Sequence, residues 1–249
     1  MNYLTKLAAP IAMSMCLIAS TGHAAGGAEL QKADIDPGQI PSLQRGARNF
    51  MNYCSGCHSA QYVRFNTIGK YLELSEEQLV ENLMFNAEKT FETIRAAMPA
   101  EDAERWYGVA PPDLSLMARA KGADYIYTFL KSFYLQEGSP TGVDNIAMPA
   151  TSMPHVLWEM QGYQNALFSE HTEDGVTTRH FEGFAPATAG TLGADEYDDF
   201  VRDTVNFLAY IAEPIRADRR KLGTWVIMYL LVFLIIAHML KKQIWKDVH

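Results

Sequence analysis

The sequence predicts a mainly helical fold with one short hairpin and a single C-terminal transmembrane helix. Apolar residues recur every three or four positions in several segments, which is the period of an amphipathic helix. Residues 167–181 combine strand-like runs with an Asp-Gly turn signal, which is typical of a hairpin. Residues 222–240 carry no formal charge and are long enough to cross a membrane.

The first predicted helix leads directly into a cysteine motif. Its apolar face runs from Leu43 to Cys54 at helical spacing. Residues 54–58 then read CSGCH, and a Cys-x-x-Cys-His run is the attachment signature of a c-type haem. In such a site the thiols of Cys54 and Cys57 bond to the haem vinyl groups, and the imidazole of His58 ligates the iron. The motif therefore predicts one covalently bound haem.

Two other chemistries use a Cys-x-x-Cys pair, namely thiol redox reactions and half of a zinc site. The chain has three cysteines, and the third is Cys16. Cys16 lies in a segment that we expect to be removed, so no second cysteine pair remains for a four-thiolate zinc site. Composition thus favours haem over both alternatives.

The N-terminus has the layout of a secretory signal peptide over residues 1–24. A short segment with Lys6 precedes an apolar stretch, and the small residues Gly22 and Ala24 suit signal peptidase. We therefore expect residues 25–221 to form an exported domain in the periplasm of a bacterium, where covalent haem attachment takes place.

The C-terminal segment 222–240 is predicted to anchor this domain in the inner membrane. Its 19 residues form about 28 Å of helix at about 1.5 Å per residue, close to the hydrocarbon thickness of about 30 Å. Lysines flank both ends, so the positive-inside rule alone does not choose the orientation. The predicted signal peptide sets the orientation, because it sends the N-terminal side of the span out of the cytoplasm. Residues 241–249 then form a cytoplasmic tail. His238, inside the span, is interpreted as an interface residue near the helix end.

Further helices are predicted from their start and stop signals. Ser75 followed by Gln78 is a capping box ahead of a helix with Leu79 and Leu83. Asp113 and Asp124 are expected as N-caps. The helices that they would begin span residues 114–120 and 125–135, with Gly122 as the break between them.

The last soluble helix is predicted over residues 200–212, where apolar residues again follow helical spacing, and it has to end near Pro214. Residues 136–152 are expected to be loop. One predicted helix enters the haem motif, and another lies far along the chain at the end of the domain. This is the arrangement in which two helices cross and the haem packs beneath them. The fold class is thus a cytochrome c-like haem domain with loop insertions and a short hairpin.

The exported domain is strongly acidic. The whole chain carries a net charge of −8, and removing the signal peptide, the membrane segment and the tail leaves −11. Such a domain is a poor nucleic-acid binder and a good target for a basic partner. Acidic residues gather at 170–174 and at 195–203. Each group is either a docking surface or a solvated face.

The haem iron needs a sixth ligand opposite His58, and methionine sulfur in that position raises the reduction potential. Met98, Met148 and Met153 each precede a proline on an expected loop, and spacing alone does not choose among them. Four other methionines, at helical spacing, are expected to fill the core: Met51, Met84, Met117 and Met160. Three histidines are further candidate ligands that are more simply explained as surface or core residues: His155, His171 and His180.

At this level the residues resemble a known family, cytochrome c1, the haem subunit of the cytochrome bc1 complex (ubiquinol:cytochrome c oxidoreductase), in its bacterial form. The resemblance covers most of the mature chain. It rests on NYCSGCHS at 52–59 followed by Tyr62, APPDLS at 110–115 followed by Arg119 and DY at 124–125, PTGV at 140–143, SMP at 152–154, and AEP at 212–214 before the membrane anchor.

The resemblance implies further haem contacts. Met153 fits the family's axial methionine better than Met148, with Met98 third. Pro112 belongs to a turn that lines the haem. Basic and aromatic residues that would meet a haem propionate are Arg119, Lys121 and Tyr125. The family usually has arginine where Lys121 stands, so a bidentate clamp becomes a point charge here.

The resemblance also implies partners: cytochrome b, a Rieske iron–sulfur protein and membrane lipid, within a dimeric complex. We therefore expect the chain to accept an electron from the Rieske centre and to pass it to a soluble, basic cytochrome c. The chain itself makes and breaks no substrate bond, so no catalytic residue is expected. The alternatives are a free-standing membrane-anchored electron shuttle and a haem sensor or peroxidase with an open sixth position.

Overall fold

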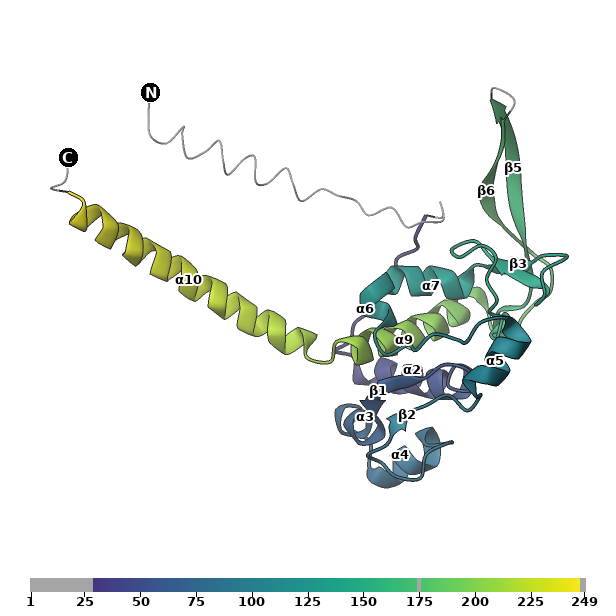
Figure 1. Cartoon of the computed structure of the whole chain (residues 1–249), viewed down its shortest axis with the longest axis horizontal. Coiled ribbons are helices and arrows are strands. Elements are labelled where there is room, and N and C mark those ends of the chain that lie inside the picture. Colours follow the sequence, from purple (N-terminus) through teal and green to yellow (C-terminus); the bar gives the residue numbers. More distant parts are fainter. Residues whose placement is uncertain (1–28, 174–175, 247–249) are drawn as a thin grey trace.

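The computed structural model describes residues 29–173 and 176–246. A helical domain carries a hairpin that projects on one side, and one long helix, α10, leaves the domain on the other (Figure 1). The predicted signal peptide, the end of the predicted tail and the turn at residues 174–175 lie outside the described residues. The mainly helical fold class is confirmed.

The core is organised by the crossing of α2 (Ile40–Tyr53) and α9 (Ala194–Ala212). The two backbones touch at Gly46, where an added Cβ would lie 2.0 Å from the carbonyl oxygen of Asp203. Beside this contact the Phe50 and Phe207 rings pack with centroids 5.7 Å apart. The predicted pair of crossing helices is therefore present, and α9 ends just before Pro214 as expected.

A buried polar network fixes how α2 and α9 sit against each other. The carboxylate of Asp203 accepts hydrogen bonds from Ser42 Oγ at 2.6 Å and from the guanidinium of Arg45. One turn on, Asn49 Nδ2 donates to Thr204 Oγ1 at 3.1 Å. Because buried polar groups are costly unless paired, these bonds select one register of the crossing.

Below this crossing lie two short helices and a small sheet. The helices are α3 (Phe65–Tyr71) and α4 (Glu76–Leu83). The capping box that the sequence predicts at α4 is present, because Ser75 Oγ accepts from Gln78 N while Gln78 Oε1 accepts from Ser75 N. Strand β1 (Ala60–Arg64) pairs antiparallel with β2 (Thr93–Ile94).

Two of the predicted helix caps are wrong. The helix expected from Leu114 begins later, as α6 (Met117–Lys121), because the Asp113 carboxylate instead accepts from the backbone N–H groups of Ser115 and Gln61. Asp124 lies inside the first turn of α7 (Ala123–Lys131), where its carboxylate accepts from Ala33 N at 3.0 Å. Tertiary partners thus replace the local capping role.

The break between α6 and α7 is at Gly122, as predicted. Its φ of +91° is a conformation that L side chains rarely adopt. Helix α7 ends at Lys131 rather than at residue 135, because β3 (Phe133–Leu135) pairs antiparallel with β4 (Val143–Asn145). The expected loop at 136–152 therefore contains a strand. Two further short helices are α5 (Ala100–Tyr107) and α8 (Trp158–Gln161).

The predicted hairpin is confirmed and is longer than expected. Strand β5 (Gln164–Glu173) pairs antiparallel with β6 (Val176–Pro186), and the register shifts between Leu167 and Phe168. About midway along the hairpin Phe168 and Phe181 contact edge to face, with ring centroids 6.0 Å apart. The hairpin projects from the domain (Figure 1), so its outer part is stabilised by the pairing of β5 with β6.

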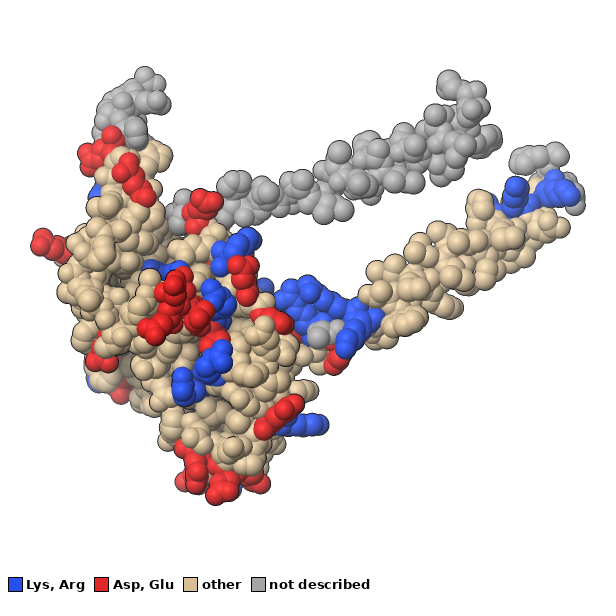
Figure 2. Space-filling view, turned by 180° about the vertical axis from the view of Figure 1, so that it is seen from behind, with Lys and Arg blue, Asp and Glu red and all other residues tan. Residues whose placement is uncertain are grey.

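Helix α10 (Arg216–Ile244) contains the expected membrane segment and is, among the described residues, the one helix long and apolar enough to span a membrane. None of its apolar window is buried against the domain. Four cations at its start form what we name the basic collar: Arg216, Arg219, Arg220 and Lys221. Figure 2 shows basic side chains gathered where α10 leaves the domain.

Candidate haem site

The Cys-x-x-Cys-His motif forms a tight turn at the end of α2. Cys54 caps the helix, with its N–H donating to Phe50 O at 2.9 Å. The N–H groups of Cys57 and His58 both donate back to Cys54 O, at 3.0 and 2.8 Å. This folds the two thiols and the imidazole into one turn of backbone, which is the compact geometry that attachment to one ring requires.

The orientation of His58 is fixed by the Pro-Pro-Asp segment. Nδ1 of His58 lies 2.8 Å from the carbonyl oxygen of Pro112, so this nitrogen is the protonated one and Nε2 is the nitrogen that can ligate iron. Burial lowers the pKa of His58, against smaller opposing effects of the Pro112 carbonyl and Asp113. The ring is therefore kept in the neutral form that a metal ligand needs.

The Pro112 carbonyl is itself held in place by hydrogen bonds to the motif. Leu114 N donates to Ser59 O at 2.8 Å, and the Asp113 carboxylate accepts from Gln61 N at 2.9 Å. The sequence analysis missed this support and treated Asp113 as a helix cap. A signal was present, because Asp-x-Ser at 113–115 is a pattern in which the carboxylate bonds backbone N–H groups two residues on.

Burial favours the protonated form of both motif thiols. Burial raises the pKa of Cys54 to about 12, with a further contribution from Cys57, and burial also raises the pKa of Cys57. Reactive and metal-binding cysteines need the opposite shift, because the thiolate is the active form. Within residues 29–173 and 176–246 no three His, Cys, Asp or Glu side chains gather as a metal site. The donor set therefore fits haem attachment.

Among the three candidate methionines, Met98 is tied to the attachment turn. Its N–H donates to Gly56 O at 2.9 Å, and Ala97 N donates to Ser55 O at 3.3 Å. A sixth ligand has to approach the iron from the ring face opposite His58. A residue bonded through its backbone to the turn that carries His58 is poorly placed for that approach.

Met153 and Met148 lie in one segment but in different surroundings. Met148 is half exposed, with 50 % of its surface accessible. Met153 is partly buried between Thr151, whose Oγ1 accepts from Met153 N at 3.4 Å, and the buried His155. The environment of Met153 is the drier of the two and thus the better one for a thioether ligand. The expected core methionines Met51, Met84, Met117 and Met160 all pack in or against the core.

His155 is a core residue with 5 % of its surface exposed. Its ring stacks on Phe133, with centroids 5.0 Å apart and planes at 9°, and meets Tyr163 edge to face. Burial lowers its pKa to about 4, a shift opposed in part by the oxygens of Gly162 and Gln161. Neither ring nitrogen makes a hydrogen bond of good geometry, and Gln161 Oε1 is likewise buried without one.

The three predicted propionate contacts come together at a second place. Arg119, Lys121 and Tyr125 line a cavity of about 550 Å³ between α6, α7 and the end of α9. Lys121 Nζ lies 5.7 Å from the centroid of the Tyr125 ring. The motif cysteines, His58 and Met153 do not line this cavity.

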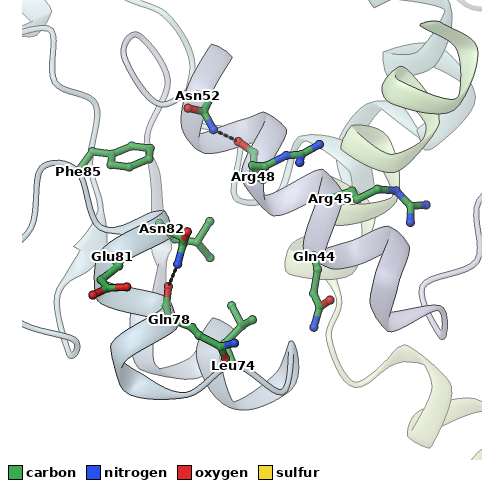
Figure 3. A pocket seen from close by; sticks show the side chains of 10 residues that line it. Gln44, Arg45, Arg48, Asn52, Leu74, Gln78, Glu81, Asn82 and Phe85 are labelled. Atoms are coloured by element: carbon green, nitrogen blue, oxygen red, sulfur yellow. Dashed lines mark hydrogen bonds between the residues drawn. The ribbon is translucent and has the colours of Figure 1, made fainter. Parts of the chain in front are cut away.

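Another cavity of about 550 Å³ lies between α2 and α4. Figure 3 shows the lining side chains on both helices, among them Arg48 and Asn52 on α2 and Gln78 and Glu81 on α4. Its polar groups largely bond within their own helices, as Asn52 Nδ2 does to Arg48 O at 2.7 Å. It too is separate from the haem motif.

Comparison with known proteins decides the family. The model of the cytochrome C1 family matches residues 36–248, from before α2 to beyond the end of α10. The chain belongs to the cytochrome c1 family. The sequence resemblance is therefore confirmed, together with one covalently bound c-type haem and a role as a haem electron-transfer subunit of the bc1 complex.

Relatives align along nearly the whole chain. Cytochrome c1 of Allochromatium vinosum is 45 % identical over 224 residues, which are 90 % of this chain and 91 % of that protein. A protein of Nitrosomonas europaea named ammonia monooxygenase gamma subunit is 38 % identical over 95 % of this chain and 97 % of its own length. The mitochondrial cytochrome c1 haem protein of Saccharomyces cerevisiae is 26 % identical over 83 % of this chain and 67 % of its own.

Proposed function

We propose that this cytochrome c1 accepts an electron from a Rieske iron–sulfur centre and passes it to a soluble cytochrome c. The observation that carries the site assignment is the hydrogen bond between His58 Nδ1 and the Pro112 carbonyl, which leaves Nε2 as the nitrogen that would ligate the iron of a bound haem. In this proposal Cys54 and Cys57 form the thioethers, and His58 and Met153 are the axial ligands.

The haem supplies the iron couple, and the protein supplies attachment, orientation and dryness. Pro112 orients the imidazole. Ser55 and Met51, beside the attachment turn, are buried and would keep water away from the His58 side of a bound haem. Arg119, Lys121 and Tyr125 are the proposed partners of the propionates. The family resemblance carries this part of the proposal, because the cavity that these residues line also contains Asp124, Glu213 and Arg216.

The proposed setting is the bacterial inner membrane, crossed once by α10, with the haem domain in the periplasm. Proposed neighbours are cytochrome b and the Rieske protein within a dimeric complex. The bare apolar surface of α10 supports helix partners in the bilayer. One relative, from Bradyrhizobium diazoefficiens, is named cytochrome b/c1, and this chain matches 33 % of its length at 25 % identity.

Haem attachment tests the proposal most directly. We expect the mature protein to retain its haem in acid acetone and to carry the mass of one haem. Replacing either Cys54 or Cys57 by Ser should leave a single thioether, and replacing both should leave extractable haem. Release of all haem from the wild-type protein would contradict the assignment.

The acidic surface predicts how the acceptor docks. Electron transfer to a basic cytochrome c should slow as salt rises, because the Debye length shrinks to about 10 Å near 0.1 M. Of the acidic residues at 195–203, Asp203 is buried and bonded to Arg45, and Asp199 pairs with Arg202. Of the group at 170–174, Glu170 lies beside Arg179, with 4.0 Å between Glu170 Oε1 and Arg179 Nε.

The structure adds a third acidic surface, the exposed carboxylates on and before α4: Glu73, Glu76, Glu77 and Glu81. The second-order rate should be measured against ionic strength for variants that neutralise each surface in turn, with Arg220→Gln in the basic collar as control. We expect neutralisation of one acidic surface to flatten the dependence of the rate on ionic strength. The Arg220→Gln control should leave that dependence unchanged. A flat wild-type profile would remove the docking hypothesis and leave the haem assignment intact.

A further inference from the structure

Two buried polar groups behind the Met153 segment are left without good hydrogen bonds, and they belong to neighbouring side chains. They are the imidazole of His155 and the Oε1 atom of Gln161. A neutral imidazole has one N–H donor and one acceptor, and an amide oxygen is an acceptor. The two groups are therefore complementary, and burial makes leaving both unpaired expensive.

Gln161 connects this place to the end of helix α7. Its Nε2 donates to the carbonyl oxygen of Lys131 at 3.1 Å. His155 in turn stacks on Phe133, two residues further along the same connection between α7 and β3. The segment that carries Met153 is thus attached to the α7–β3 connection twice, through a ring stack and through an amide.

We propose that His155, paired with Gln161, is a positioning residue that holds Met153 at the distance at which its sulfur can ligate the haem iron. His155 does so from two residues away in sequence and Gln161 from eight, without contacting the iron. This inference rests on the proposed assignment of Met153 as the axial ligand.

The chain offers a matched control in Gln164. Gln164 Nε2 donates to the same Lys131 oxygen at 2.9 Å and also to Phe133 O at 2.7 Å. A Gln164→Met variant therefore loses at least as many backbone contacts as Gln161→Met does. Gln161 differs from Gln164 in that its Oε1 is buried without a hydrogen bond and in that its side chain interacts with the imidazole of His155.

The test uses the full-length haem protein in mild detergent and titrates the ferric form with imidazole, which competes with methionine for the iron. We expect Gln161→Met and His155→Phe, which keeps the ring stack, to weaken the methionine-to-iron charge-transfer band. Both should raise the affinity for added imidazole about tenfold, the equivalent of about 1.4 kcal/mol. The double variant should show little more than either single one, and Gln164→Met should behave as wild type.

Equal effects of Gln161→Met and Gln164→Met, or wild-type titrations for both His155→Phe and Gln161→Met, would overturn the positioning role. Met153→Leu in the same titration separates this failure from a failure of the ligand assignment. If Met153→Leu removes the band while the His155 and Gln161 variants keep it, the positioning role alone is wrong. If Met153→Leu keeps the band, the axial assignment is wrong as well.

Discussion

Replacing Met153 by Leu is expected to remove the methionine-to-iron charge-transfer band and to lower the reduction potential of the haem. A thioether opposite histidine stabilises ferrous iron, so its loss favours the ferric state. Leucine has nearly the same volume as methionine, and such exchanges usually cost less than about 1.5 kcal/mol of stability. The domain should therefore stay folded, and the spectrum and the potential should report on ligation alone.

Met148→Leu is the matched control, because Met148 lies five residues earlier in the same segment and is half exposed. It should leave both the band and the potential as they are in the wild type. The reverse pattern would transfer the axial role to Met148. No effect from either variant would direct attention to Met98 or to a histidine, and a high-spin ferric wild type would instead favour the sensor or peroxidase alternative.

Gly46→Ala is expected to prevent accumulation of the haem protein. The new Cβ would lie 2.0 Å from the backbone oxygen of Asp203 and 2.8 Å from Cβ of Phe207, and neither neighbour is the free end of a side chain. The two helices would have to separate, which also breaks the Asp203 network. We expect a cost above about 3 kcal/mol, at the severe end for a single substitution. Haem staining of membranes and proteolytic stability measure it.

Gly69→Ala provides the comparison, since Gly69 is also a buried helical glycine. The atom nearest to its new Cβ would be a methyl group of Leu79 at 2.9 Å, which can rotate away. Alanine is the better helix former by about 1 kcal/mol, so this variant should accumulate nearly as well as the wild type. Equal accumulation of the two variants would show that the α2–α9 contact does not limit folding.

The helices that the sequence predicted well are those whose signals are local. The capping box of α4 involves residues three apart, and the end of α9 is dictated by Pro214 in the chain itself. Asp113 and Asp124 carry the same kind of signal, yet their carboxylates bond Gln61 and Ala33, which lie 52 and 91 residues away. Composition and spacing do not reveal such distant competitors.

The residues of the candidate site also differ in whether their contacts are local in the sequence. Cys54, Cys57 and His58 are contiguous, so their turn follows from the motif. Pro112 could be placed only through the family resemblance, because its contact with His58 joins residues 54 apart in sequence. The acidic group at 195–203 shows the opposite failure, since a run of carboxylates looks uniform in sequence while Asp203 faces the core.

The basic collar places four cations at one end of an acidic domain, where Glu213 pairs with Arg219 and lies near Arg216. The cations lie within the first two turns of α10, whereas residues 25–221 as a whole carry a net charge of −11, so the rest of that segment is more negative still. The field of the collar decays over a Debye length of about 8 Å at physiological ionic strength, roughly five residues of helix at about 1.5 Å each. Beyond that distance the acidic remainder of the domain sets the field that a positively charged protein meets.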